Sequence, residues 1–241
     1  MPSVRPRFGI RALLVLVACC AIGSWAWVDL MSPSHRWQRA IRSDNDSSHR
    51  WEAARAAISG KVDRLGRTEA IEAFVQALSD PSPRVRETAV WALRGLPGPE
   101  ARLAIPGLIG ALKDPSSSIR FQAVRSLGSI VQSEPAGRPP VIPALVGLLT
   151  DRNPEVRVRA GFWLSQMGRG EVAAPVLARA IREGHDAGGF AALGLGLSGS
   201  TDPAAAAALK LAAEGSYDPG IRKMAVEALA RIEAARIGTP P

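Results

Sequence analysis

An acidic, a basic and an aromatic side chain lie close together in residues 80–96, which read DPSPRVRETAVWALRGL and contain Asp80, Arg86 and Trp91. Grouped so closely, these side chains suggest a site. Similar stretches begin at Asp114 (DPSSSIRFQAVRSLG), at Asp151 (DRNPEVRVRAGFWLSQMG) and, in shortened form, at Asp218 (DPGIRKMAVEALARI). Because each copy has the aspartate and the arginine, we interpret these two as structural. Trp91 is the member that the other copies lack.

Other residues with catalytic or metal-binding potential form no constellation. The three histidines, His35, His49 and His185, have no metal-ligand spacing. The chain has no Gly-x-Ser-x-Gly elbow, phosphate-binding loop or dinucleotide fingerprint. We therefore expect no metal, no cofactor and no small-molecule substrate, and a protein that is not an enzyme.

The composition favours packed helices. Hydrophobic residues make up 46% of the 241 residues, which excludes wholesale disorder, while aromatic residues make up only 5%. The formal net charge is +8. Three arginines precede the first apolar run and every acidic residue follows it, so the rest of the chain is only mildly basic. The charge alone gives little support to nucleic-acid binding.

The N-terminus has the pattern of a membrane anchor. A basic flank (residues 1–11) precedes 17 residues without formal charge (residues 12–28) that end in Trp25 and Trp27. A helix of this length is about 25 Å long, close to what spans a bilayer, and terminal tryptophans suit the headgroup region. The run Phe8-Gly9-Ile10-Arg11-Ala12-Leu13-Leu14 also resembles anchors that are common on bacterial membrane proteins.

Alternatives to a retained signal anchor remain open. Ser24-Trp25-Ala26 loosely fits the cleavage site of a secretory signal, and Leu16-Val17-Ala18-Cys19 resembles a lipobox with Cys19 as the acylated residue. A buried core helix is a further alternative. Basic residues flank the run on both sides, but a short basic N-terminus usually stays in the cytoplasm, so we expect an extracytoplasmic body behind a short linker (residues 29–34).

The body of the chain repeats a helical pattern. Aligning the copies on their arginines gives steps of 36, 34, 37 and 65 residues, the last spanning two units. Small or apolar residues lie three, four and seven positions after each arginine. These positions form one continuous stripe along a face of an α-helix. The aligned arginines are Arg50, Arg86, Arg120, Arg157 and Arg222.

A second helix is predicted before each Asp-Pro turn. The expected helices run over residues 70–78, 105–112, 142–149, 174–181 and 203–211, and four of them have a proline (Pro106, Pro143, Pro175 or Pro203) that we expect at the helix start. We expect the turn aspartates to cap the second helix of each unit. The prediction is an all-α solenoid of about six helical hairpins over residues 35–238, with a tail at 239–241. The glycine-rich stretch 185–199 is its predicted weak joint.

The Asp-Pro turn, the Val/Ile-Arg pair about six residues later and the following Ala-Val-x-x-Leu-Gly together resemble the HEAT-repeat family, most closely its short, bilin-lyase-type variant. The resemblance covers about residues 35 to 237. It implies that turn aspartates and arginines form a ladder between neighbouring units. The implied ladder residues are Asp80, Arg86, Asp114, Arg120, Asp151, Arg157, Asp218 and Arg222.

A solenoid of this kind presents its second helices on a concave face. Positions two and five after each arginine should point there, and the mixture of aromatic and arginine side chains is typical of protein interfaces. The alternative is that the aromatic residues pack between units. The expected partner-binding residues are Arg55, Thr88, Trp91, Gln122, Arg125, Arg159 and Phe162.

The sequence therefore predicts a non-catalytic, membrane-tethered scaffold that binds another protein. Two other functional classes remain open. One is a lyase or chaperone-lyase of the bilin-lyase class, which would act on a protein substrate. The other is a HEAT-like nucleic-acid binder, which would need a cytoplasmic body and a steep salt dependence.

Overall fold

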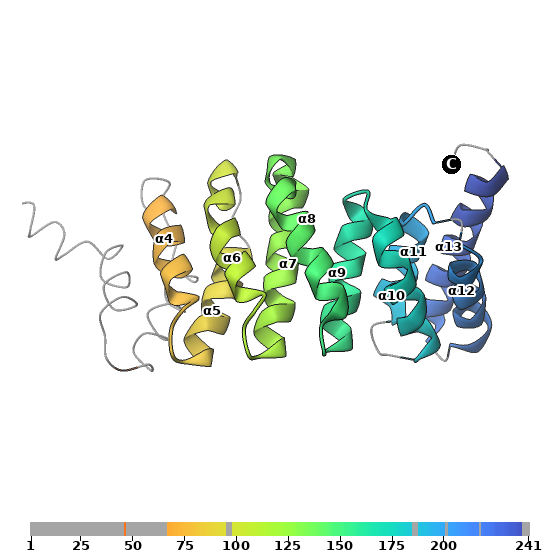
Figure 1. The fold of residues 1–241 in the computed structure, drawn as a ribbon, viewed down its shortest axis with the longest axis horizontal. Helices are drawn as coiled ribbons and strands as arrows, with labels where there is room; N and C mark the ends of the chain where they lie inside the picture. The colour runs from red at the N-terminus through yellow and green to blue at the C-terminus, as the bar shows by residue number, and fades with distance from the viewer. Residues whose placement is uncertain are drawn as a thin grey trace, which may run out of the picture.

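The computed structural model describes residue 46 and residues 67–94, 98–184, 188–200, 202–216 and 218–237. These residues form an all-helical solenoid, as the sequence predicts (Figure 1). No helix within the described ranges is both long and apolar enough to cross a membrane. The predicted anchor (residues 12–28), Cys19, Arg55 and most of the first predicted hairpin lie outside the described residues.

The described helices pair into consecutive hairpins, each with a first and a second helix. Two first helices carry short 3-10 segments, labelled η. In chain order, the elements are α4 (Arg67–Ala77), α5 (Pro83–Arg94), η2 (Pro99–Ala104), α6 (Ile105–Ala111), α7 (Ser117–Ser133), η3 (Pro135–Gly137), α8 (Arg138–Gly147), η4 (Leu148–Thr150), α9 (Pro154–Gln166), α10 (Gly170–Arg182), α11 (Gly188–Leu197), α12 (Pro203–Gly215) and α13 (Pro219–Ile237).

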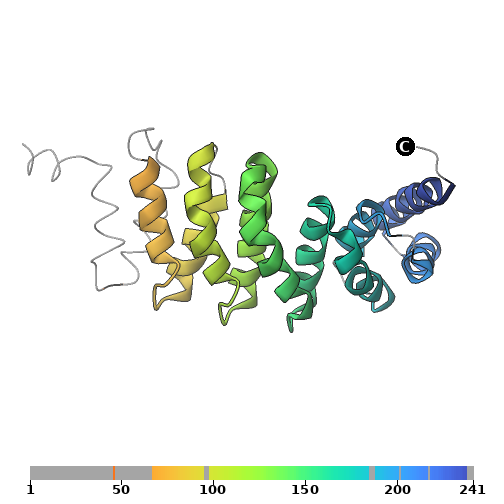
Figure 2. The ribbon, with the colours of Figure 1, turned by 45° about the horizontal axis from the view of Figure 1, so that its top comes forward.

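The hairpins stack side by side into two layers, and the array bends and twists towards its C-terminal end (Figure 2). The second helices α5, α7, α9, α11 and α13 contact one another along the whole array. Among the first helices, α10 and α12 contact each other extensively, whereas α6 and α8 meet at few residues and α8 and α10 barely meet. In the middle of the array the second helices are therefore more closely spaced than the first helices.

The predicted apolar stripe forms the core between the layers. Leu93, Leu127 and Leu164, each seven residues after its arginine, are completely buried. Four residues after the arginine, Val124 is also completely buried, whereas the corresponding Val226 of α13 is 56% exposed. In the described part of the chain no further hairpin follows α13, so this face of α13 has no neighbour to cover it.

The expectation that the prolines stand at helix starts is wrong at two positions. Pro106 and Pro203 do lie in the first turn of α6 and α12. Pro143 lies inside α8 and Pro175 inside α10. Each of these helices begins several residues earlier than predicted, so its proline removes one hydrogen bond of the helical ladder.

Asp218 directly precedes α13 and accepts the N–H groups of Gly220 and Ile221, as expected of a cap. By contrast, Asp114 and Asp151 do not occupy the cap positions that the sequence suggests. The residues at the N-caps of α7 and α9 are Ser116 and Asn153. Asp114 and Asp151 lie two residues earlier, where one carboxylate oxygen accepts the backbone N–H of Ser116 or Asn153 at 2.8 Å. These bonds fold the turn before the helix starts, and they leave the other carboxylate oxygen available to a neighbouring unit.

Within the glycine-rich stretch 185–199, the predicted weak joint, residues Gly188–Leu197 form a packed helix, α11. A Cβ on Gly194 would lie 2.8 Å from Leu177 and 3.3 Å from the backbone of Phe162. A Cβ on Gly196 would lie 2.7 Å from the Ala228 methyl group. The glycines therefore let α11 approach α9, α10 and α13 closely, which side chains at these positions would prevent.

Candidate functional site

Arginine and aromatic side chains lie in a row across the second-helix layer. The row consists of Trp91 and Arg94 from α5, Phe121 and Arg125 from α7, Arg159 and Phe162 from α9, and Phe190 from α11. We call these seven residues the arginine–aromatic row. On each of the first three helices its two members are three or four positions apart, so they share one face of the helix.

The members of the row contact one another across the units. The guanidinium of Arg159 lies 3.5 Å from the ring centre of Phe190 and 5.1 Å from that of Phe121, which joins α7, α9 and α11. Arg125 also lies over Phe121, at 5.9 Å. The ring of Phe162 meets that of Phe190 edge to face, with centroids 5.5 Å apart.

The N-terminal end of the row is the most exposed part. Arg94 lies over the ring of Trp91 at 4.5 Å, and Trp91 is 46% exposed. Phe190, at the other end, is 38% exposed. Large aromatic side chains exposed beside stacked guanidinium groups are typical of binding surfaces.

The three arginines of the row repel one another. Burial, followed by the charge of Arg125, lowers the pKa of Arg159 to about 10, and Glu155 acts in the opposite direction. Burial and the charge of Arg94 lower the pKa of Arg125. Within the described ranges, Arg94, Arg125 and Arg159 make no salt bridge with a carboxylate. Within the described residues, the row is therefore a line of arginines that no carboxylate pairs with.

The row includes some of the residues predicted from the sequence and omits others. Trp91, Arg125, Arg159 and Phe162 belong to it. Thr88 uses its hydroxyl to donate a hydrogen bond to the carbonyl of Arg84 in its own helix, at 2.8 Å. Gln122 is half-buried beside the row, and its side-chain oxygen has no hydrogen-bond partner in the described part of the molecule.

Sequence reasoning missed three members of the row. Arg94 lies eight residues after its aligned arginine, and Phe121 lies one residue after its own. Neither therefore falls two or five residues after an arginine, where the sequence analysis placed the partner-binding residues. Phe190 lies in a unit without an aligned arginine. Extending the same helical face by one turn in each unit would have found Arg94, because residues 91 and 94 lie on one side of a helix.

Charged side chains at the hairpin turns join neighbouring units on another side of the molecule. Arg120 donates two hydrogen bonds to the carboxylate of Asp151 in the next unit, both 2.8 Å long, and both side chains are more than nine-tenths buried. A third nitrogen of Arg120 donates to the carbonyls of Asp114 and Pro115 in its own turn. One guanidinium thus holds its own turn and the next one together.

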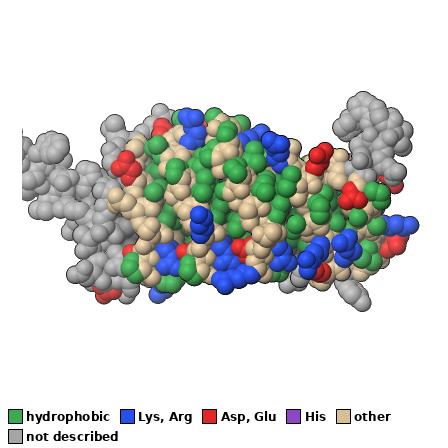
Figure 3. All heavy atoms as spheres, in the orientation of Figure 1, with side chains coloured by type: hydrophobic (Ala, Val, Ile, Leu, Met, Phe, Trp, Pro, Cys, Tyr) green, Lys and Arg blue, Asp and Glu red, His purple; other side chains and the backbone are tan. Residues whose placement is uncertain are grey.

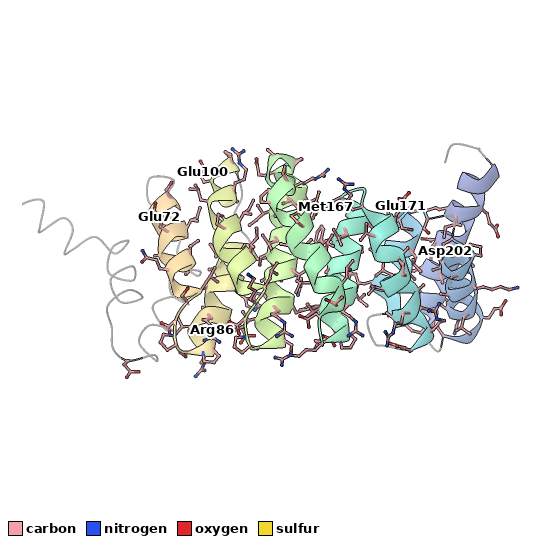
Figure 4. The ribbon with its side chains drawn as sticks, viewed as in Figure 1. Glu72, Arg86, Glu100, Met167, Glu171 and Asp202 are labelled. Carbon is pink, nitrogen blue, oxygen red and sulfur yellow. The ribbon has the colours of Figure 1, made fainter. Side chains whose placement is uncertain are left out.

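The preceding pair repeats this arrangement. Arg86, labelled in Figure 4, donates to Asp114 of the next unit at 2.6 and 3.2 Å and to the carbonyl of Asp80 in its own turn at 2.8 Å. Burial alone would raise the pKa of Asp114, but its hydrogen bonds with Arg86 and with the N–H of Ser116 outweigh burial and lower that pKa.

Further along the chain the contacts change. Arg157 and Arg222 each donate to a carbonyl of their own turn, Asp151 and Ser216 respectively. Asp218 accepts the N–H of Gly220 at 2.7 Å, a bond within its own turn. Residues 185–187, which precede α11, lie outside the described residues.

A small cavity lies between α7, α8 and α9. Its volume is about 60 Å³, and Trp163 and Met167 line it, the latter labelled in Figure 4. The Arg138 Nε and Trp163 Nε1 groups at its wall are buried without a hydrogen-bond partner in the described part of the chain. This volume suits one or two water molecules and is far below that of a typical substrate pocket. The described residues also contain no grouping of acidic, histidine or cysteine side chains that could hold a metal ion.

The opposite layer has a different surface. In the orientation of Figure 3, apolar side chains gather over the middle of the array and basic side chains along the edge formed by the turns. Leu103, Val146, Val172 and Leu211 of the first-helix layer are among its exposed apolar residues. The stacked arginines and aromatic rings therefore distinguish the second-helix layer.

Comparisons with solved structures show the fold. An engineered protein matches with a TM-score of 0.62 and 21% identity, over 85% of this chain and 98% of the other. A designed armadillo repeat protein in complex with the peptide (KR)4 matches with a TM-score of 0.61 and 19% identity, over 82% and 99%. The karyopherin Kap121p, bound to the extreme C-terminus of the protein phosphatase Cdc14p, matches with a TM-score of 0.54 and 15% identity, over 95% of this chain and 27% of the karyopherin.

Sequence comparison gives the family. No curated protein matches the chain. The sequence pattern of HEAT repeats matches residues 36–105 and 105–188, together more than half of the chain. The matched region includes three complete described hairpins, α4–α5, α6–α7 and α8–α9, with their turn aspartates and arginines. The chain therefore belongs to the HEAT-repeat family.

Proposed function

We propose that this protein is a non-catalytic, membrane-tethered HEAT-repeat scaffold that binds a protein partner through the arginine–aromatic row. The observation that carries the proposal is the row itself. It extends over four consecutive hairpins, and it combines exposed aromatic rings with arginines that have no carboxylate partner in the described residues. Aromatic and arginine side chains are the residues that dominate binding energy at protein interfaces.

Proteins of similar fold support this proposal. A designed armadillo repeat protein was solved with a bound peptide, and a karyopherin was solved with a bound C-terminal segment of a phosphatase. A stack of helical hairpins presents side chains from successive units at regular intervals, and this suits it to follow an extended partner segment.

Site-specific photocrosslinking in intact cells tests the binding surface. A photoreactive amino acid replaces Trp91 in the row or, as the control, Leu211 in the first-helix layer, which is 52% exposed. We expect a discrete protein adduct from position 91 and none from position 211. Adducts of equal pattern at both positions, or no adduct at position 91, would contradict the proposal.

The membrane tether rests on residues 12–28 and is tested separately. We propose that this segment holds the body at the membrane on its extracytoplasmic side. The full chain should stay in the membrane pellet after alkaline carbonate extraction. A compartment-specific reporter fused after Pro241 should be active only outside the cytoplasm. Recovery in the soluble fraction argues against the tether, and a cytoplasmic reporter signal argues against the orientation.

A further inference from the structure

We propose that the partner segment is an acidic, extended peptide whose carboxylates bind Arg94, Arg125 and Arg159. This inference rests on the proposed function, because it concerns the chemistry of the same surface. It adds a class of partner and a spacing for its acidic residues.

Charge complementarity carries the inference. The three arginines come from three consecutive second helices. The charge of Arg94 contributes to the lowered pKa of Arg125, and the charge of Arg125 contributes to the lowered pKa of Arg159. None of them makes a salt bridge within the described ranges, whereas Arg86 and Arg120 each bind a carboxylate. An acidic ligand would supply the missing counter-charge at a partly desolvated site, where charge-assisted hydrogen bonds are strongest.

Stacking against the aromatic rings prepares the arginines for this role. A guanidinium on a ring face keeps its N–H groups directed sideways, where they remain free to donate to a carboxylate. Arg159 is held between Phe121 and Phe190, and Arg94 is held over Trp91. The side chains therefore lose little conformational freedom when a ligand binds.

The same contacts favour a peptide over a single-stranded nucleic acid. Nucleic-acid bases bind by stacking on open aromatic faces. In the row, Arg159 already lies over Phe121 and Phe190. In addition, Gln122 beside the row has a side-chain oxygen without a hydrogen-bond donor in the described part of the molecule. After a rotation of this side chain, a peptide N–H could donate to that oxygen.

The geometry of the stack sets the spacing of the acidic residues. Neighbouring helices pack about 8–10 Å apart, and an extended peptide advances about 3.3 Å per residue. A peptide that runs along the array thus passes one unit about every three residues. We infer an acidic residue at every third position.

Fluorescence anisotropy with the full chain in detergent micelles tests this inference. The probe is a rhodamine-labelled peptide of three Glu-Gly-Ser repeats. Three comparison probes are a peptide of the same composition with its glutamates consecutive, a Lys-Gly-Ser peptide and a short oligothymidylate. The protein variants are R125Q, R159Q and, as the matched control, R179Q in the exposed first-layer pair of Arg179 and Glu183.

We expect the spaced acidic peptide to bind more tightly than the other three probes. R125Q and R159Q should each weaken its binding by about tenfold, the usual effect of one charge-assisted hydrogen bond, while R179Q leaves it unchanged. Higher salt should weaken binding as well. Circular dichroism melting curves of the variants show whether they remain folded, and R125K, which keeps the charge but not the planar group, should bind with intermediate affinity.

Other outcomes overturn the inference. Tighter binding of the lysine peptide or of oligothymidylate contradicts an acidic peptide partner, and so does the absence of binding to any probe. Equal binding of the spaced and consecutive acidic peptides contradicts the spacing. If these probes fail while position 91 still crosslinks to a protein, the scaffold function stands and only the partner chemistry is wrong.

Discussion

Replacing Asp151 with asparagine tests whether the buried ladder holds neighbouring hairpins together. Asp151 accepts two 2.8 Å hydrogen bonds from Arg120, and the two side chains are 6% and 7% exposed. Asparagine keeps the size of the side chain and can still accept the N–H of Asn153, but it leaves the buried Arg120 guanidinium without its paired carboxylate.

The structure gives the size of the effect. Each hydrogen bond to a charged group contributes about 1.5–3 kcal/mol, and breaking a buried ion pair costs about 3–5 kcal/mol. We therefore expect D151N to lower the free energy of unfolding by about 3–5 kcal/mol. The matched control is E214Q, which breaks the exposed pair of Lys210 and Glu214, 4.0 Å apart. It should change stability by less than about 0.5 kcal/mol.

Urea unfolding followed by far-ultraviolet circular dichroism measures both variants, and R120M completes a double-mutant cycle. Removing both partners should cost clearly less than the sum of the single changes, because no unpaired charge remains. A cost of D151N below about 1 kcal/mol, or simple additivity in the cycle, would refute the reasoning.

The pH dependence of the protein's stability follows from the same pair of Arg120 and Asp151. Burial alone would raise the pKa of Asp151, but hydrogen bonds from Arg120 and from the N–H of Asn153 outweigh it and lower this pKa below its ordinary 3.8. The carboxylate therefore contributes stability above pH 3.8, and this contribution is lost as the pH falls through the lowered value. The difference in the free energy of unfolding between wild type and D151N should therefore become smaller as the pH falls over that acidic range.

Two further predictions concern packing and binding. A Cβ on Gly128 would overlap the indole of Trp163, so G128A should lower the free energy of unfolding by about 1–3 kcal/mol and change the tryptophan fluorescence. G110A in α6 meets no atom within 4 Å and should be neutral or stabilising; equal losses in both variants would contradict the packing argument. Since the pKa of Arg159 is about 10, peptide affinity should fall as the pH rises through that value, and R159Q should lack this fall in anisotropy titrations.

Local patterns in the sequence are sufficient to predict much of the fold. Helical periodicity around Arg86, Arg120 and Arg157 places Leu93, Leu127 and Leu164 on a buried stripe, and all three are completely buried. Such a stripe can be predicted from the sequence because a helix must bury one face, whichever element packs against it. Helix starts were less predictable. Pro143 and Pro175 lie inside helices because packing can stabilise a helix that local preference would begin later.

The sequence pattern alone is sufficient to predict the hairpin repeat, the buried stripe and the set of arginines and turn aspartates. The contacts that these residues make with one another depend on the tertiary structure. Arg120 pairs with Asp151, 31 residues away, and the glycines of α11 allow the close approach that brings Phe190 to Arg159. The physical reason is that periodicity fixes the direction of a side chain around its own helix. Contacts between units depend on the spacing and rotation of stacked helices, which the packing of all units sets together.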